Sequence, residues 1–147
     1  MELTEWKKGN YIISTDKSKI DVPIVHNFLS HSYWAGQIPR ETVKESIENS
    51  LCFGIYHYEE LVGFARVITD FATFAYLADV FVLPPERGKG LSKWLMEVII
   101  DHPRLQGLRR FILATRDAHK LYSQFGFRPF AKPERWMERH NPDIYKK

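Results

Sequence analysis

The first third of the chain places one short apolar run before two segments of helical hydrophobic period. Residues 11–14 form an apolar run typical of a short strand. Asp21 is a suitable N-cap for the next helix, because apolar side chains recur behind it at three- and four-residue spacing. A second short helix is predicted over 39–49, with Val43 and Ile47 as its buried stripe.

The middle of the chain changes to segments rich in aromatic and β-branched residues. Three such segments lie at 51–58, 61–69 and 74–83, and each is separated from the next by a short turn. Consecutive strands joined by short turns predict an antiparallel meander.

The last third alternates helices with strands. A helix is predicted over 90–100 from its apolar face, and a strand over 110–115. Asp117 is then the expected cap of a helix that ends at Gly126, and 127–131 is the expected return strand. The whole pattern predicts an α/β fold with a mixed sheet of about six strands.

Composition makes one folded domain the simplest organisation of residues 1–147. A chain of 147 residues with 44% hydrophobic positions suits a single domain with a substantial core. No apolar window approaches the roughly 18 residues of a membrane span, so no membrane partner is expected. The N-terminus lacks the pattern of a secretory signal, and Cys52 has no second cysteine to pair with. We therefore expect a cytoplasmic protein.

The charge of the chain is too mild to specify a partner. Its formal net charge is +3, with a local excess of cations in the last third. A solvated surface explains this excess, so nucleic acid is not an expected partner. The alternative that some cations meet a phosphorylated small molecule stays open. The 6 histidines show no ligand spacing for zinc, so no metal site is expected.

The sharpest local feature is a glycine-containing loop between the third strand of the meander and the helix that follows it. Gly88 and Gly90 let the backbone turn tightly and approach a ligand closely. The first amides of a helix lack partners and suit a phosphate or pyrophosphate, to which Arg87 and Lys89 would add charge. The loop fits neither the P-loop pattern nor the three-glycine dinucleotide fingerprint.

Two motifs resemble those of the GNAT superfamily of N-acetyltransferases. The segment 82–95 resembles motif A, Arg/Gln-x-x-Gly-x-Gly/Ala, with matches at Arg87 and Gly90 and a small departure at Ser92. The segment 118–127 resembles motif B, Ala-x-x-Leu/Phe-Tyr-x-x-x-Gly-Phe. The resemblance implies the GNAT fold, a mixed and mostly antiparallel central sheet of about six to seven strands, flanked by helices and splayed at the coenzyme site.

For function, the resemblance implies an N-acetyltransferase that moves an acetyl group from acetyl-CoA to a primary amine by direct transfer in a ternary complex. Acetyl-CoA is then the acyl donor, and no metal is needed. Backbone groups of one strand would pair with the pantetheine arm, at Phe81, Val82 and Leu83. Amides of the loop would hold the pyrophosphate, at Arg87, Gly88, Lys89, Gly90, Leu91 and Ser92. Transfer of a different acyl group, and a non-catalytic acyl-CoA sensor, remain alternatives.

Three further positions carry candidate roles in this chemistry. Tyr122 stands where the family places its general acid, although a core tyrosine would show the same pattern. Thr115 stands where many members have an asparagine that touches the coenzyme. Asp79 interrupts an apolar strand, where strand alternation puts it on one face with Leu77 and Phe81. It is the candidate base, and pairing with the nearby arginine of the hairpin is the alternative.

The acceptor side is the least determined part of the sequence. Tyr33 and Trp34 lie in an aromatic loop between the first two helices, so they are candidates for the acceptor wall, with core packing as the alternative. Trp136 and Met137 in the tail are candidates for closing the same cleft. The expected partner is a small-molecule or peptide amine. Homodimers are common in the superfamily, so a second copy is an open alternative.

Overall fold

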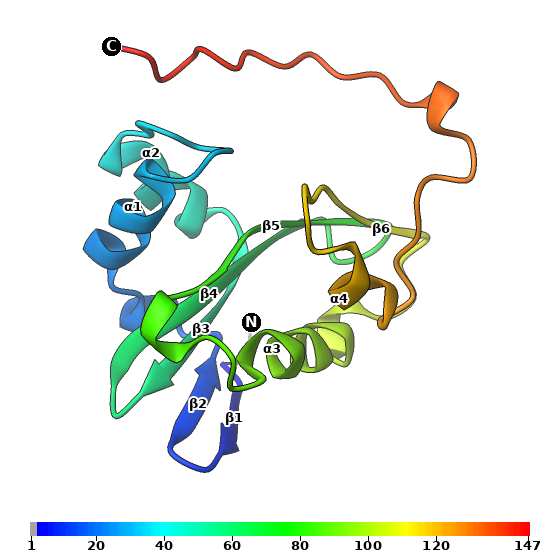
Figure 1. The fold of residues 1–147 in the computed structure, drawn as a ribbon. Helices are drawn as coiled ribbons and strands as arrows, with labels where there is room; N and C mark the ends of the chain where they lie inside the picture. Colours follow the sequence, from blue (N-terminus) through cyan, green and yellow to red (C-terminus); the bar gives the residue numbers. More distant parts are fainter. Residues whose placement is uncertain (1–2) are drawn as a thin grey trace.

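The computed structural model describes residues 3–147, which form one six-stranded sheet with helices on both faces (Figure 1). The strands follow one another in the order β1-β2-β3-β4-β5-β6. They are β1 (Glu5–Lys8), β2 (Tyr11–Ser14), β3 (Leu51–His57), β4 (Glu60–Thr69), β5 (Phe74–Val82) and β6 (Arg110–Leu113). The helices are α1 (Val22–Ser30), α2 (Arg40–Glu48), α3 (Leu91–Ile100) and α4 (His119–Ser123). The predicted α/β fold with a mostly antiparallel sheet is confirmed.

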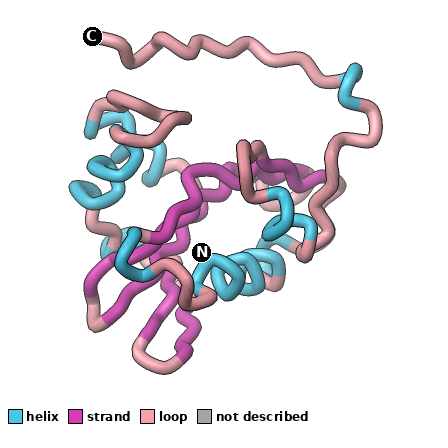
Figure 2. The backbone as a smooth tube through the Cα atoms, viewed as in Figure 1, coloured by secondary structure: helices cyan, strands magenta, loops and turns pink. Residues whose placement is uncertain are grey.

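Two hydrophobic clusters cover the two faces of the sheet. One joins the buried side chains of α3 and α4 to the sheet, including Phe53 and Leu95. The other joins α1 and α2 to the opposite face, including Val25, Val43 and Phe64. Helices lie on both sides of the sheet (Figure 2), and the apolar contacts of the two clusters hold the sheet against them.

The sheet splits between β5 and β6. These two strands pair in parallel, from Phe74 opposite Arg110 to Leu77 opposite Leu113. β5 continues to Val82, whereas β6 ends at Leu113. The second half of β5 therefore has no neighbour on that side, and a gap opens in the sheet.

A bulge in β5 changes which residues share a face. The register with β4 shifts between Phe64 and Arg66, and Asp79 has a φ of 55°. A bulge places two residues opposite one and reverses the alternation beyond it. Leu77 consequently packs in the α3 cluster and Phe81 in the α1 cluster. The prediction that Asp79 shares one face with both was wrong.

Other boundaries also differ from those predicted. The strand predicted over 127–131 does not form, because this segment makes no ladder with β6, and Pro129 has no amide to donate. β1 takes the place of that strand in the count of six. Asp117 does not cap α4; instead the Thr115 hydroxyl accepts the Ala118 amide at 3.0 Å, Ala118 is the N-cap, and α4 starts one residue later than expected.

Other predictions hold. Asp21 caps α1 by accepting the amide of Ile24 at 3.1 Å. In residues 3–147 no helix has the length and apolar character needed to cross a membrane.

Candidate active site

The loop before α3 is built to leave backbone amides open. Gly88 and Gly90 have φ values of 79° and 78°, a region that L-residues rarely adopt. No neighbouring atom lies within 4 Å of where a Cβ would stand at either position. Gly90 occupies the N-cap of α3 without a side-chain cap, so the first amides of the helix stay free for an anion.

Glu86 ties this loop to the sheet. Its carboxylate accepts the Tyr11 hydroxyl at 2.6 Å and the Lys89 ammonium at 3.0 Å, and His57 Nδ1 lies 3.4 Å away. The Tyr11 hydrogen bond, followed by that from Lys89, lowers the pKa of Glu86. The Arg87 guanidinium turns back and donates Nε to the Val82 carbonyl at 2.9 Å. Both cations of the loop are thus held by the protein itself.

Removal of the Glu86 anchor is expected to weaken coenzyme binding. In Glu86→Ala the loop loses its hydrogen bonds to Tyr11 and Lys89, so coenzyme A affinity should fall about three- to tenfold by calorimetric titration. Tyr11→Phe removes one of the two donors and should give a smaller loss in the same direction. Glu97→Ala, on the exposed side of α3, is the matched control and should bind as the parent chain does. Unchanged affinity in Glu86→Ala would show that the loop does not need this anchor.

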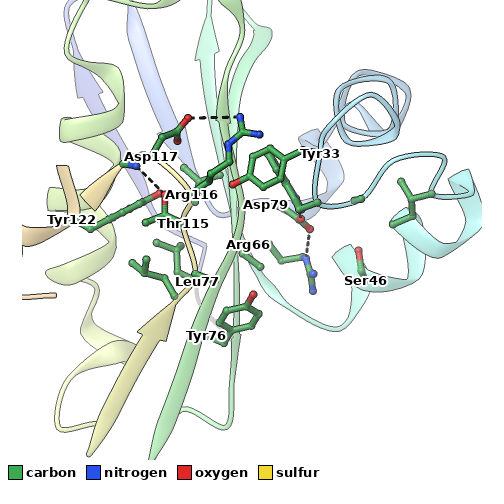
Figure 3. Close-up of a pocket in the computed structure, with 18 of the residues that line it drawn as sticks. Tyr33, Ser46, Arg66, Tyr76, Leu77, Asp79, Thr115, Arg116, Asp117 and Tyr122 are labelled. Atoms are coloured by element: carbon green, nitrogen blue, oxygen red, sulfur yellow. Dashed lines mark hydrogen bonds and ion pairs between the residues drawn. The ribbon is translucent and has the colours of Figure 1, made fainter. Parts of the chain in front are cut away.

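A cavity of about 540 Å³ lies beside the gap between β5 and β6 (Figure 3). Its walls come from the α1–α2 loop, α2, β5 and the segment between β6 and α4. Five residues singled out from the sequence line it together: Tyr33, Trp34, Asp79, Thr115 and Tyr122. The fold therefore brings the candidate acid, the candidate base and the candidate acceptor wall to one space.

Asp79 is held by two donors within this cavity. Arg66 Nε lies 2.9 Å from its Oδ2, and Trp34 Nε1 donates to its Oδ1 at 2.8 Å. The Asp79 side chain is only 10% exposed, which strengthens both interactions. Arg66 is fixed in turn by donating to the Ser50 hydroxyl at 3.1 Å. The pairing with an arginine of the hairpin, foreseen as an alternative, is present, and the carboxylate still lines the cavity.

Tyr122 is the buried member of the site. It projects from α4, packs edge-on against Phe127 and is 8% exposed. Its hydroxyl has no hydrogen-bond partner within residues 3–147. Burial raises the pKa of this phenol, so the neutral form persists through the physiological range. A neutral phenol at this position can donate a proton.

The aromatic loop is exposed rather than part of the core. Tyr33 and Trp34 are 57% and 41% exposed, and the Arg116 guanidinium lies 4.0 Å from the centre of the Tyr33 ring. Neither Trp136 nor Met137 lines the cavity; Tyr145, near the end of the tail, lies there instead.

Sequence reasoning missed Tyr145, Arg116 and Tyr76 as members of the site. No local pattern marks them, because their positions follow from how distant segments meet.

The cysteine is unsuited to carry an acyl group. Cys52 is fully buried in the α1 cluster and does not itself line the cavity. Burial raises the pKa of its thiol to about 12, so the nucleophilic thiolate is scarce at neutral pH. No group of three or more potential metal-binding side chains occurs in the part of the chain that the structure describes.

Known proteins resemble this chain in both sequence and fold. The model of the acetyltransferase (GNAT) family matches residues 22–127. A candidate acetyltransferase of Gibberella zeae is 32% identical over 142 residues, which cover 81% of this chain and 79% of that protein.

Two crystal structures show the same fold. A candidate GNAT acetyltransferase of Xanthomonas campestris pv. campestris is 51% identical and superposes with a TM-score of 0.91, covering 93% of this chain and 97% of that one. A candidate acetyltransferase of Clostridium acetobutylicum, crystallised with acetyl-CoA, is 14% identical with a TM-score of 0.62, covering 89% and 95%.

Proposed function

The chain belongs to the acetyltransferase (GNAT) family, and from that premise we propose that it transfers an acetyl group from acetyl-CoA to a primary amine, directly and within a ternary complex. One observation carries the proposal. Three features follow one another along the end of β5: the loop with its free helix amides, the gap between β5 and β6, and the cavity that Tyr122 lines.

The residues present fit a coenzyme A molecule. A pyrophosphate suits the amides that follow Gly88 and Gly90, where both backbone angles and free space allow close approach. The Leu83 amide donates to Val62 of β4 at 2.8 Å, so the backbone groups of Val82 face the gap. The Arg87 guanidinium already donates to the Val82 carbonyl. The Val82 amide is therefore the backbone group of this residue that is left to hydrogen-bond acetyl-CoA. The acetyl-CoA in the Clostridium acetobutylicum protein supports the choice of donor.

Acetyl transfer requires three functions that the site can supply. The amine nitrogen forms a bond to the thioester carbonyl carbon, the carbon–sulfur bond breaks, and one proton passes from nitrogen to a base. The Val82 amide stabilises the charge that develops on the carbonyl oxygen. The neutral phenol of Tyr122 protonates the departing sulfur. Asp79 accepts the amine proton, directly or through water, while Arg66 and Trp34 orient its carboxylate.

The proposal is tested by thiol release from acetyl-CoA across a panel of amines. Stoichiometric release of coenzyme A and formation of an N-acetyl product would support it. Tight coenzyme binding without turnover on any amine would instead identify an acyl-CoA sensor. Faster turnover with propionyl- or succinyl-CoA than with acetyl-CoA would identify a different acyl group.

Asp79→Asn is expected to lower kcat/KM. The amide that replaces the carboxylate cannot accept a proton from the amine, so the base is lost. The same change leaves Arg66 without its ionic partner and should lower the free energy of unfolding by about 1–3 kcal/mol.

Arg66→Gln separates the two roles of Asp79. This variant keeps the carboxylate and removes its ionic partner. A base role predicts that Arg66→Gln retains most of the rate that Asp79→Asn loses. Equal losses of rate in both variants would show that the aspartate is only a structural partner.

A further inference from the structure

A second cavity, of about 770 Å³, follows the outer edge of β6. One wall is the whole of β6, Arg110–Leu113, and the other is the segment 126–131 that leaves α4 and passes beside it (Figure 1). A smaller cavity of about 390 Å³ shares Arg109, Arg110 and Ala131 with it and adds Lys132, Arg135 and Trp136. We call the two together the β6 trough.

The β6 trough is strongly cationic. Its lining contains five permanent cations and no carboxylate: Arg109, Arg110, Arg128, Lys132 and Arg135. None of these five makes an ion pair within 4.0 Å in the described residues 3–147. Unpaired like charges that face one hollow favour a ligand of opposite charge.

The trough also offers a free strand edge. β6 pairs with β5 on one side, and no strand of residues 3–147 pairs with its other side. The neighbouring segment touches β6 through Phe127, whose ring lies edge-on to that of Phe111 at 5.4 Å, rather than through a hydrogen-bonded ladder. An extended polypeptide can bind such an edge by adding a strand.

The trough leads to the acceptor cavity. The two share Leu113, Ala114, Thr115 and Tyr122 in their linings. At about 3.3 Å per residue, three steps of strand separate Leu113 from Arg110 by roughly 10 Å. In an extended peptide whose reacting amine lies at Tyr122, the side chain three or four residues away would therefore reach Arg110.

We propose that the acyl acceptor is an amine on an acidic polypeptide, which lies along β6 and places its carboxylates against Arg110, Lys132 and Arg135. This inference rests on the proposed acetyl transfer and names its substrate class. A single-stranded nucleic acid fits less well. Trp136 is already stacked with Phe130 at 4.2 Å and carries the Arg110 guanidinium at 4.9 Å, so it has no free face for a base.

The test compares peptides that differ only in charge. One has glutamates three and four residues from its free amine, and the other has glutamines there; N-terminal and lysine amines are tried in both. The glutamate peptide should have a KM roughly tenfold lower at equal kcat, and added salt should reduce the difference. In Arg110→Glu/Arg135→Glu the preference should reverse toward a peptide with lysines at those positions. Lys7→Gln/Lys8→Gln, on the far edge of the sheet, is the control and should keep the parent's preference.

The outcomes separate this inference from the function on which it rests. Equal KM for glutamate and glutamine peptides, or turnover only of small amines, would overturn the acidic polypeptide while leaving acetyl transfer in place. Turnover only of phosphorylated small amines, or salt-sensitive binding of single-stranded RNA in preference to the acidic peptide, would also overturn it. Failure to bind coenzyme A, or to acetylate any amine, would be a failure of the proposed function itself.

Discussion

Gly90→Glu is expected to lower coenzyme A affinity at least about 100-fold, to below detection in most titrations. Gly90 has a φ of 78°, and any L-residue in that region costs about 1–2 kcal/mol. The glutamate carboxylate would also sit at the N-terminus of α3, where it would repel a pyrophosphate and compete for the same amides. Charge-assisted hydrogen bonds are worth about 1.5–3 kcal/mol each, so the loss of two accounts for the expected effect.

Two further variants separate strain from charge in this prediction. Gly107 has a φ of 74° and equally open surroundings but lies outside the coenzyme loop. Gly107→Glu should therefore lower the unfolding temperature as Gly90→Glu does, while coenzyme affinity stays that of the parent chain. Gly90→Ala adds the strain without the charge and should bind with intermediate affinity. Parent-like affinity in Gly90→Glu would show that the pyrophosphate binds elsewhere.

The fold was predictable where one physical signal dominates a segment. Periodic apolar residues on α1, α2 and α3 form the buried stripes that the pattern indicated, because each helix covers one face of the sheet. β1 was not predicted from the sequence, because it is an edge strand whose residues are exposed apart from the half-buried Trp6. The segment 127–131 has the apolar character of a strand, yet lacks the ladder that would make it one.

The parts of the site that lie in short sequence motifs were predictable, whereas the parts formed by contacts between distant segments were not. The glycine loop and Tyr122 stand in short motifs, so sequence alone could place them. The environment of Asp79 depends on a bulge with a positive φ at a non-glycine residue, which no sequence pattern announces. Trp34 lies 45 positions away from Asp79 in the chain and meets it only because α1 packs beside Phe81. The sequence shows a local excess of the cations of the β6 trough, but it does not show that their side chains line the same hollow.

Tyr122→Phe is expected to lower kcat about 100- to 1,000-fold while both KM values change little, because general acid catalysis contributes a factor of this size and the ring itself stays in place. The phenol oxygen has no hydrogen-bond partner in residues 3–147, so its removal should leave the unfolding temperature unchanged. Tyr56→Phe is the matched control, since it removes a hydroxyl without a partner from another buried tyrosine, outside the cavity. Its kcat should equal that of the parent chain.

The pH profile tests the same role independently. Burial disfavours the phenolate and raises the pKa of Tyr122 above its ordinary value near 10. The acid is therefore active below that pKa and is lost as the pH rises through it, so the parent rate should not decline from this cause before pH about 10. Tyr122→Phe should lack this alkaline limb. A variant that keeps kcat within about twofold of the parent would mean that the sulfur departs as a thiolate, stabilised by the free amides of the β5–α3 region rather than protonated by a side chain.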